Sequence, residues 1–438
     1  MTDDLSTSRG ASKTSLPFPV RFQPKMPSTE QQVDQVRKVR LGSDPLALYV
    51  HVPFCVTRCY FCDFVTVVGK SVTPELIDRY AGALNTELDF YAEDSAFRDA
   101  SFETAQLGGG TPTMLSPRQL DDLLARMRHY LRGSPDAEIL VEGFPTSVTP
   151  DKLEVLRTAG NIKFNMGVQT FDDEVLEAVG RRHERDDAMR AITQSKQAGL
   201  PSVGIDLIYG LPGGGTEVIA ADVRTALDFE VDHIALYPLW VYPQTRLNSL
   251  IATGRRSSTE FMERQEQLLV ADSMLRAAGY ERYTSFHYSR GPEHHHQYGL
   301  WQMRGQDWLG VGQAAASQLN DVVYENDRNI NSYVALAGTR AETAVTADHL
   351  DHRARMVRHL SYGIRERRYS LHAFEARFGA SPHDVFGPEI EWMAAEELVE
   401  ATPDHLELTL QGVLRLGDIE EVLAPADPFV AEAGACCG

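Results

Sequence analysis

The sequence predicts an α/β protein, in which a partial, TIM-like parallel barrel of about six βα units is followed by a smaller, mostly helical domain of winged-helix type. Three observations support this prediction. Strand-like and helix-like segments alternate from about residue 45 to residue 240. Glycine-rich turns follow two strands, at 108–112 and 210–215, where parallel barrels build active sites. From about residue 345 the pattern changes to successive helices.

Each unit of the barrel is expected as a short apolar or alternating strand followed by a helix. The expected strands are 46–52, 103–107, 137–142, 163–169, 202–209 and 233–237. The expected helices are 73–95, 116–131, 150–159, 172–179, 186–198, 218–229 and 260–278. A threonine cap before Pro74 marks the first helix start. The C-terminal part is expected to hold helices at 350–367, 371–377 and 387–399 and a strand at 404–409.

These patterns divide the chain into four parts. Residues 1–44 are polar and rich in Pro, Ser and Thr, which is typical of a flexible arm. Residues 45–335 are expected to form the barrel with an adjoining segment, residues 345–425 the C-terminal domain, and residues 426–438 a tail. Winged helices often bind DNA, but the acidity of this chain favours a structural or substrate-covering role.

The charge of the chain excludes several classes of function. Lys and Arg number 42 and Asp and Glu number 62, so the formal net charge is −20. Binding to nucleic acid or to an anionic membrane surface needs basic patches, so we expect neither partner. The sequence has no apolar run of 18 residues and no apolar secretory segment at its N-terminus. With only five cysteines, these features predict a cytoplasmic protein.

Three of the five cysteines, Cys55, Cys59 and Cys62, lie within eight residues, directly after the first expected strand. Thiolates suit iron–sulfur clusters, and three ligands would leave one iron of a [4Fe–4S] cluster open for chemistry. A zinc site that uses His51 is an alternative, but no second Cys or His pair follows at finger spacing. A disulfide or buried free thiols would not explain the regular spacing. The loop therefore predicts a cluster with an open iron.

The spacing Cys-x3-Cys-x2-Cys resembles the radical S-adenosylmethionine (SAM) superfamily, and further motifs resemble its coproporphyrinogen-oxidase-like (HemN-like) branch. The resemblance covers about residues 45–420, and its motifs are Tyr49–Phe64, Gly108–Pro112, Gly167–Phe171, Gly180–His183 and Asp206–Pro212. It implies a radical SAM barrel in which Cys55, Cys59 and Cys62 bind a [4Fe–4S] cluster. It also implies that SAM chelates the open iron and is cleaved by one electron from a reductant such as flavodoxin or ferredoxin.

The resemblance also implies a set of SAM-binding residues, because two SAM molecules can bind in this branch. Phe61 could stack on adenine, the glycines of 108–111 allow close backbone approach, and Glu142 could bind the SAM ammonium. Arg181 suits a carboxylate and Asp206 a ribose hydroxyl or an ammonium. The implied SAM-binding residues are Tyr49, Phe61, Gly109, Gly110, Thr111, Glu142, Gln169, Arg181, Asp206, Gly310, Gly312 and Ala316.

The residue after the triplet, Asp63, bears on the member of the branch, because the oxygen-independent oxidase has a further cysteine there. The haem-trafficking chaperone has Cys-Asp-Phe, as here, but its His-Asn-x-x-Tyr-Trp motif is changed at His296–Trp301. We therefore expect a class C radical SAM methyltransferase of natural-product biosynthesis. It would use two SAM molecules to methylate an sp2 carbon of a small heteroaromatic or modified-peptide substrate, such as a thiazole. A haem chaperone and a coproporphyrinogen dehydrogenase-like enzyme are the alternatives.

Other residues are weaker candidates, and no catalytic residue or proton acceptor is assigned. The histidines at 294–296 could touch substrate or, less simply, ligate a metal. Cys436 and Cys437 read as incidental thiols of a tail, although a methyl-carrying thiol is conceivable. An aromatic lining for a flat substrate could come from Trp240, Tyr242, Tyr283, Tyr288, Tyr298 and Trp301.

Overall fold

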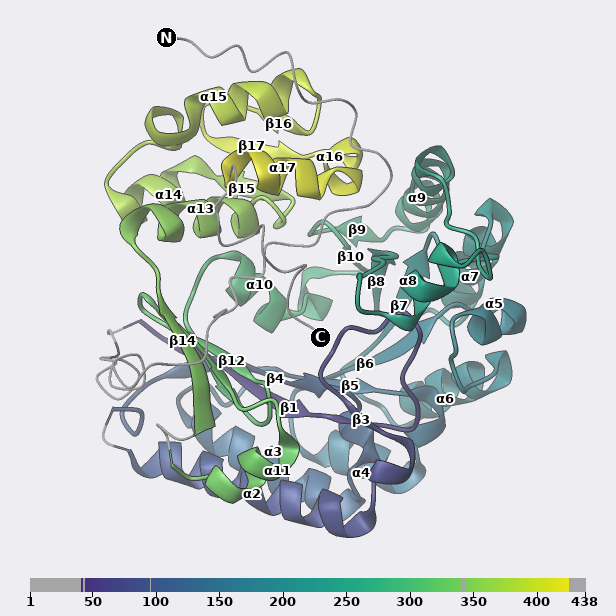
Figure 1. Cartoon of the computed structure of the whole chain (residues 1–438), viewed down its shortest axis with the longest axis vertical. Coiled ribbons are helices and arrows are strands. Elements are labelled where there is room, and N and C mark those ends of the chain that lie inside the picture. Colours follow the sequence, from purple (N-terminus) through teal and green to yellow (C-terminus); the bar gives the residue numbers. More distant parts are fainter. Residues whose placement is uncertain (1–40, 42–43, 95, 340–342, 425–438) are drawn as a thin grey trace.

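The computed structural model of the chain describes residues 41, 44–94, 96–339 and 343–424 (Figure 1). Most of the predicted 1–44 arm and the whole 426–438 tail, with Cys436 and Cys437, lie outside the described residues. No helix within the described ranges is long and apolar enough to cross a bilayer.

A partial barrel of parallel strands forms the centre of the protein, as predicted. The strands are β1 (Leu46–Val52), β4 (Phe102–Gly109), β5 (Ile139–Gly143), β6 (Ile162–Gln169), β7 (Ser202–Tyr209) and β8 (His233–Pro238). They pair in parallel in the order β1-β4-β5-β6-β7-β8. Because both faces are covered, most of their residues are buried, which explains their nearly continuous apolar runs.

The barrel helices begin and end close to the expected residues, because capping signals lie in the local sequence. They are α2 (Pro74–Glu93), α3 (Pro117–Tyr130), α4 (Pro150–Thr158), α5 (Asp173–Ala178), α6 (Arg185–Gln197), α7 (Thr216–Asp228) and α9 (Phe261–Ala277). The short helix α8 (Arg246–Ala252), which begins after a Thr245 cap, was not expected. The Thr73 side chain accepts a hydrogen bond from the Leu76 N–H, and Ser116 and Gln119 form a capping box. Figure 1 shows these helices along the outside of the sheet.

The main sheet extends beyond the predicted barrel at both edges. β9 (Glu281–Arg282) and β10 (His287–Ser289) add antiparallel strands next to β8. On the other edge, β11 (Trp308–Val311) pairs in parallel with β1 and leads to the antiparallel strands β12 (Ala316–Leu319), β13 (Val322–Asn326) and β14 (Ala344–His349). The sheet thus has 12 strands among the described residues, and it continues to His349, past the expected end of the barrel at residue 335.

Short elements complete the described chain. The two-residue strands β2 (Phe54–Cys55) and β3 (Val67–Val68) pair in parallel across the cysteine loop. Helices α10 (Gln297–Met303) and α11 (Ile330–Leu336) interrupt the added strands.

The C-terminal domain is mostly helical, as predicted, and it contains a three-stranded sheet where a single strand at 404–409 was expected. Its elements are α13 (His352–Gly363), β15 (Arg368–Ser370), α14 (Leu371–Phe378), α15 (Pro382–Ala395), β16 (Val399–Ala401), β17 (His405–Leu408), α16 (Leu410–Leu414) and α17 (Leu416–Leu423). The expected helix at 387–399 lies earlier, because Ser381 caps a helix whose first residue is Pro382. Figure 1 shows this domain in yellow-green at the top, near α10 and β9.

Candidate functional site

The cysteine loop follows β1 at the carboxyl end of the parallel sheet. Val52 of β1 lies in register with Gly109 of β4, which brings the loop beside the glycine turn. All three thiols are free, half-buried, and line one cavity of about 370 Å³. Such a cavity is large enough for a small-molecule ligand. The structure thus places the predicted cluster ligands together in the expected part of the fold.

Burial controls the chemistry of the thiols. It raises the pKa of the Cys55 thiol and raises the pKa of Cys62 to about 11, with the neighbouring Cys59 adding to both effects. These two groups therefore stay protonated at neutral pH unless a metal centre binds and displaces the proton. Among the described residues, no three His, Cys, Asp or Glu side chains are arranged around a single metal ion. The donor set suits a cluster, whose cysteines bind different iron atoms.

Two polar contacts hold the cysteine loop against the rest of the cavity. The Cys55 Sγ lies 3.6 Å from the Thr111 Oγ1, and the Arg181 Nη1 donates a hydrogen bond of 3.3 Å to the Cys59 Sγ. The Nε of Arg181 is buried and has no partner within the described part of the chain. A guanidinium beside a thiol stabilises the thiolate form. These residues therefore fit a [4Fe–4S] cluster, which when bound would supply an open iron site and one electron.

The glycine turn brings its backbone against the cysteine loop. The Gly110 N–H donates to the Val52 carbonyl at 2.7 Å. A Cβ on Gly110 would lie 2.7 Å from the Pro53 carbonyl carbon and 2.8 Å from the Phe54 oxygen. Gly109 has a φ of +113°, a region that favours glycine. The two glycines are thus required by close packing under Cys55.

Replacing Gly110 by alanine is expected to weaken both the fold and the cluster site. The new Cβ would meet backbone atoms of Pro53 and Phe54 that cannot move without shifting Cys55. We expect a loss of about 1–3 kcal/mol in the free energy of unfolding, as for other overpacked sites, and a lower iron content after reconstitution.

Thermal denaturation and iron analysis of the Gly110→Ala protein check this expectation. Gly82→Ala is the matched control, because Gly82 lies on an exposed face of α2 and a Cβ there meets no atom within 4 Å. It is expected to be neutral or to gain about 0.5–1 kcal/mol from helix propensity. A Gly110→Ala protein with wild-type melting and iron content would contradict the packing argument.

Two carboxyl groups form the opposite wall of the cavity. Glu142 at the end of β5 accepts hydrogen bonds from the Gln106 Nε2 at 2.6 Å and the Gly109 N–H at 3.1 Å. Burial, with a smaller contribution from Asp206, raises its pKa to about 7. Burial likewise raises the pKa of Asp206 to about 6, although the Asn165 Nδ2 donates to it at 2.7 Å. Both groups can bind a ligand ammonium or hydroxyl.

Gln169 and Arg181 complete the polar wall. Gln169 is 8% exposed and has a φ of +75°, an uncommon conformation that is costly for a non-glycine residue. The Arg181 guanidinium donates to the Gly167 carbonyl and lies over the Phe144 ring, with 4.7 Å from Cζ to the ring centre. The bend at Gln169 thus turns the end of β6 toward the cavity.

The cavity gathers most of the residues that the sequence singled out. Those lining it are Cys55, Cys59, Cys62, Phe61, Gly109, Gly110, Thr111, Glu142, Gln169, Arg181 and Asp206. Four implied SAM-binding residues do not line it: Tyr49, Gly310, Gly312 and Ala316. The Tyr49 hydroxyl instead bonds the His51 Nδ1 at 2.9 Å, and the Gly312 N–H donates to Glu87 at 3.0 Å. A SAM-binding role for these four stays a prediction.

The aromatic lining differs from the predicted one. Trp240 and Tyr242 line the cavity, whereas Tyr283, Tyr288 and Tyr298 are buried in the core and Trp301 packs beside Tyr298. The sequence analysis missed several lining residues, which are Phe144, Ile208, Tyr237 and Leu239. Tyr237 and Ile208 could have been found from their places near the carboxyl ends of expected strands.

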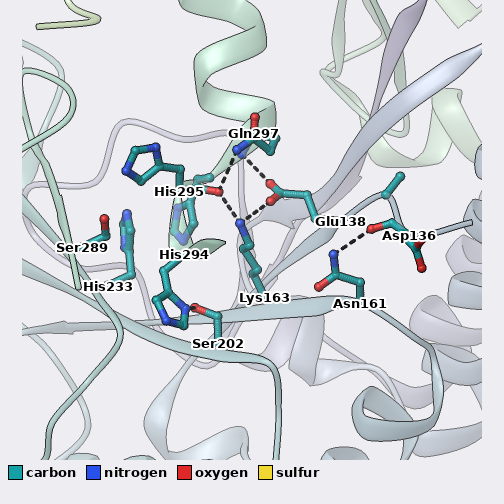
Figure 2. A network of polar contacts seen from close by, with 12 residues as sticks. Asp136, Glu138, Asn161, Lys163, Ser202, His233, Ser289, His294, His295 and Gln297 are labelled. Atoms are coloured by element: carbon teal, nitrogen blue, oxygen red, sulfur yellow. Dashed lines mark hydrogen bonds and ion pairs between the residues drawn. The ribbon is translucent and has the colours of Figure 1, made fainter. Parts of the chain in front are cut away.

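The histidines at 294–296 do not line the cavity. His294 Nδ1 bonds the Ser202 Oγ at 3.1 Å, and the His296 ring stacks on His233 with 3.5 Å between ring centres. Figure 2 shows the backbone carbonyl of His295 beside Lys163, whose ammonium also pairs with Glu138 at 2.6 Å. These contacts fix the segment within the protein, and they do not support the expected contact with substrate.

The cysteine triplet over a glycine turn at the carboxyl edge of a partial barrel defines a radical SAM protein. Residues 49–224 match the Radical SAM superfamily, and residues 350–415 match the HemN C-terminal domain. The heme chaperone HemW of Mycobacterium tuberculosis is 32% identical over 307 residues, which are 69% of this chain and 77% of that protein. The chain therefore belongs to the HemN-like branch of the radical SAM superfamily, whose members use a [4Fe–4S] cluster and SAM.

Two further comparisons extend over nearly the whole described chain. The heme chaperone HemW of Bacillus subtilis is 27% identical over 369 residues, which are 84% of this chain and 96% of that protein. The solved structure of coproporphyrinogen III oxidase (HemN) from Escherichia coli is similar with a TM-score of 0.74 at 23% identity, covering 94% of this chain and 96% of that one. The similarity to the HemN structure confirms the predicted fold, a partial parallel barrel followed by a helical domain.

The expectation of a class C methyltransferase of natural-product biosynthesis is wrong. The two curated relatives described above are named heme chaperones, and the similar solved structure is that of a coproporphyrinogen III oxidase. The features behind the expectation, which are the cluster loop, the SAM motifs and the changed 296–301 segment, are compatible with other activities of the branch. They therefore do not identify methyl transfer.

Proposed function

We propose that this chain is a haem-handling protein of the chaperone type that carries a [4Fe–4S] cluster and binds SAM. The proposal rests mainly on the similarity to the heme chaperone HemW of Bacillus subtilis, which covers 84% of this chain and 96% of that protein. The cysteine loop supports it, because Cys62 is followed by Asp63 and not by a further cysteine. The Asp63 carboxylate lines the cavity and accepts a hydrogen bond from the Gln244 side chain.

The cavity supports a ligand with a flat apolar body and a polar edge. Its polar lining includes the thiols, Glu142 and Asp206, and its apolar lining includes Ile208, Leu239 and Trp240. Aromatic and aliphatic side chains contact ring systems, whereas a few polar groups set their orientation. We propose that SAM binds beside the three cysteines and that a tetrapyrrole contacts Ile208, Leu239 and Trp240.

His296 is not the haem contact in this conformation. Its side chain is only 6% exposed and stacks on His233, and its N–H donates to the Tyr283 hydroxyl at 3.0 Å. Burial lowers the pKa of His296 well below its ordinary value, so the ring is neutral. A large planar ligand reaches this ring only after α10 moves. We therefore place the proposed haem contact at the cavity.

Anaerobic reconstitution followed by two separate titrations tests the function. Protein with a full cluster is mixed with haem, and uptake is followed by the Soret band and by later transfer to apomyoglobin. A second sample receives SAM and a reductant, and 5′-deoxyadenosine is measured with and without haem. We expect stoichiometric haem uptake, transfer to apomyoglobin, and no modified tetrapyrrole.

The outcomes separate the proposal from its alternatives. A cluster-loaded protein that takes up no haem would overturn the chaperone function. Conversion of coproporphyrinogen III with stoichiometric 5′-deoxyadenosine would identify a dehydrogenase-like enzyme. The number of SAM molecules bound per protein tests the second SAM that the resemblance implies, since one site predicts a stoichiometry of one.

A further inference from the structure

Tyr237 lines the cavity from β8 and contacts a histidine behind the wall. Its hydroxyl lies 3.0 Å from the Nε2 of His287, and the two rings meet edge to face at 86°. His287 belongs to β10, which pairs with β8 so that His287 lies opposite Ala235. The cavity wall is thus connected to the histidine-rich segment that the sequence singled out, although the histidines at 294–296 do not reach the cavity.

Thr284 determines which nitrogen of His287 carries the proton. The Thr284 Oγ1 accepts hydrogen bonds from the Phe286 N–H at 3.2 Å and the His287 N–H at 3.0 Å. Both lone pairs of this oxygen are therefore used, and its own proton is left to donate to the His287 Nδ1 at 2.8 Å. Burial lowers the pKa of His287 to about 4, so the imidazole is neutral and its proton lies on Nε2.

This tautomer makes Tyr237 a donor toward the cavity. The His287 Nε2–H donates to the Tyr237 oxygen, so the phenolic proton cannot point back at the histidine. Burial, with Asp206 and Glu142 nearby, raises the pKa of Tyr237, and the phenol keeps its proton. The hydroxyl has no other partner among the residues described here. Its proton is therefore available to a ligand.

The surroundings of Tyr237 favour an oxygen acceptor. The adjacent wall is apolar at Ile208, Leu239 and Trp240, where a hydrogen bond to an ionised acceptor is stronger than in water. Arg58 and Arg181 line the same cavity and offset the charges of the acidic wall. A ligand cation is a poorer partner for Tyr237, because the neutral oxygen already accepts from the histidine and has only its second lone pair left.

We infer that Tyr237 donates a hydrogen bond to a carboxylate oxygen of the tetrapyrrole in this cavity, with His287 and Thr284 as positioning residues. The inference rests on the proposed function, because haem carries propionate carboxylates at the edge of a flat apolar ring. It adds a specific contact and a ligand group to that function. Nothing in the comparisons assigns a role to these three residues.

A cycle with two ligands and two proteins tests the contact. Wild type and Tyr237→Phe are each titrated with haem and with haem dimethyl ester, in which the carboxylates are neutral. We expect the substitution to weaken haem binding by about tenfold or more and to leave ester binding within about twofold. Tyr209→Phe is the matched control, because its buried hydroxyl on the neighbouring strand has no partner among the described residues and does not line the cavity.

Thr284 variants test the positioning role. Thr284→Val removes the hydroxyl that directs the His287 tautomer, so Tyr237 can donate to His287 and no longer to the ligand. We expect haem and ester to bind equally to this variant, and Thr284→Ser to restore the preference for haem. If Thr284 had only a structural role, Thr284→Val would weaken the binding of haem and of the ester by the same factor, and the ratio of their dissociation constants would stay as in wild type.

The outcomes distinguish this inference from the proposed function. If the wild-type protein binds no haem, the proposed haem-handling function is wrong. Wild type that binds haem, with Tyr237→Phe binding haem and ester as wild type does, sinks only the Tyr237 contact. A Tyr237→Phe protein with weakened SAM binding and unchanged haem binding assigns the donor to SAM and also overturns the inference.

Discussion

Replacing Cys55 by alanine is expected to abolish the iron–sulfur cluster. The three thiols line one cavity, and no other cysteine lies in the described residues to replace a lost ligand. Two ligands cannot hold the cluster against hydrolysis, so bound iron and acid-labile sulfide should fall to background, and SAM cleavage with them. Iron and sulfide analysis, with the visible absorption spectrum after anaerobic reconstitution, measures this directly.

The control uses the remaining cysteines of the chain. A Cys436→Ala/Cys437→Ala protein loses two thiols outside the described residues and is expected to keep wild-type iron and sulfide. If Cys55→Ala retained the cluster while the tail variant lost it, the assignment of ligands would be refuted. Equal loss in both would show that the tail also contributes to the cluster.

Replacing Lys163 by methionine is expected to give the largest loss of stability. Lys163 is 5% exposed and Glu138 3% exposed, and their charged groups lie 2.6 Å apart (Figure 2). Lys163 also donates to the His295 carbonyl, while the Gln297 N–H donates to Glu138 at 2.5 Å. Without the ammonium, Glu138 is a buried charge with too few partners, which costs about 3–5 kcal/mol.

Thermal or urea denaturation checks this expectation. The double variant Lys163→Met/Glu138→Gln is expected to recover part of the loss, because no charge remains buried. Arg157→Met is the matched control, since it removes a cation from the exposed Arg157–Glu154 pair and should change stability little. If Lys163→Met melted like Arg157→Met, the buried pair would not be a stabilising contact between β6 and the residue before β5.

Local signals explain the elements that were predicted well. The limits of β1 and β7 agree with the expected 46–52 and 202–209, because apolar runs end at turn residues there. The start of α2 follows from its Thr73 cap and Pro74. Glu142, Gln169 and Asp206 were found for a related reason: the carboxyl ends of neighbouring parallel strands meet at one edge of a sheet.

Long-range pairing explains the elements that were missed. The strands β10 to β14 contain three to six residues each, which is too short for a clear alternation, and two of them join the sheet through distant segments, because His287 of β10 lies opposite Ala235 of β8 and Trp308 of β11 lies opposite Ala47 of β1. The role of Tyr237 depends on His287, fifty positions later in the chain. Tyr49 alternates as a strand residue should, but only the packing of α10 brings its ring into a stacked contact with Tyr298.

The sequence by itself predicted the cysteine triplet as cluster ligands, the barrel and most of the polar residues that line the cavity, because these follow from short spacings and from strand ends. Only the tertiary structure decided which aromatic groups face the cavity, that the histidines at 294–296 turn away from it, and that Tyr237 at the cavity wall contacts His287. The physical reason is that the direction of a side chain depends on the neighbours that pack and hydrogen-bond with it, and these come from distant parts of the chain.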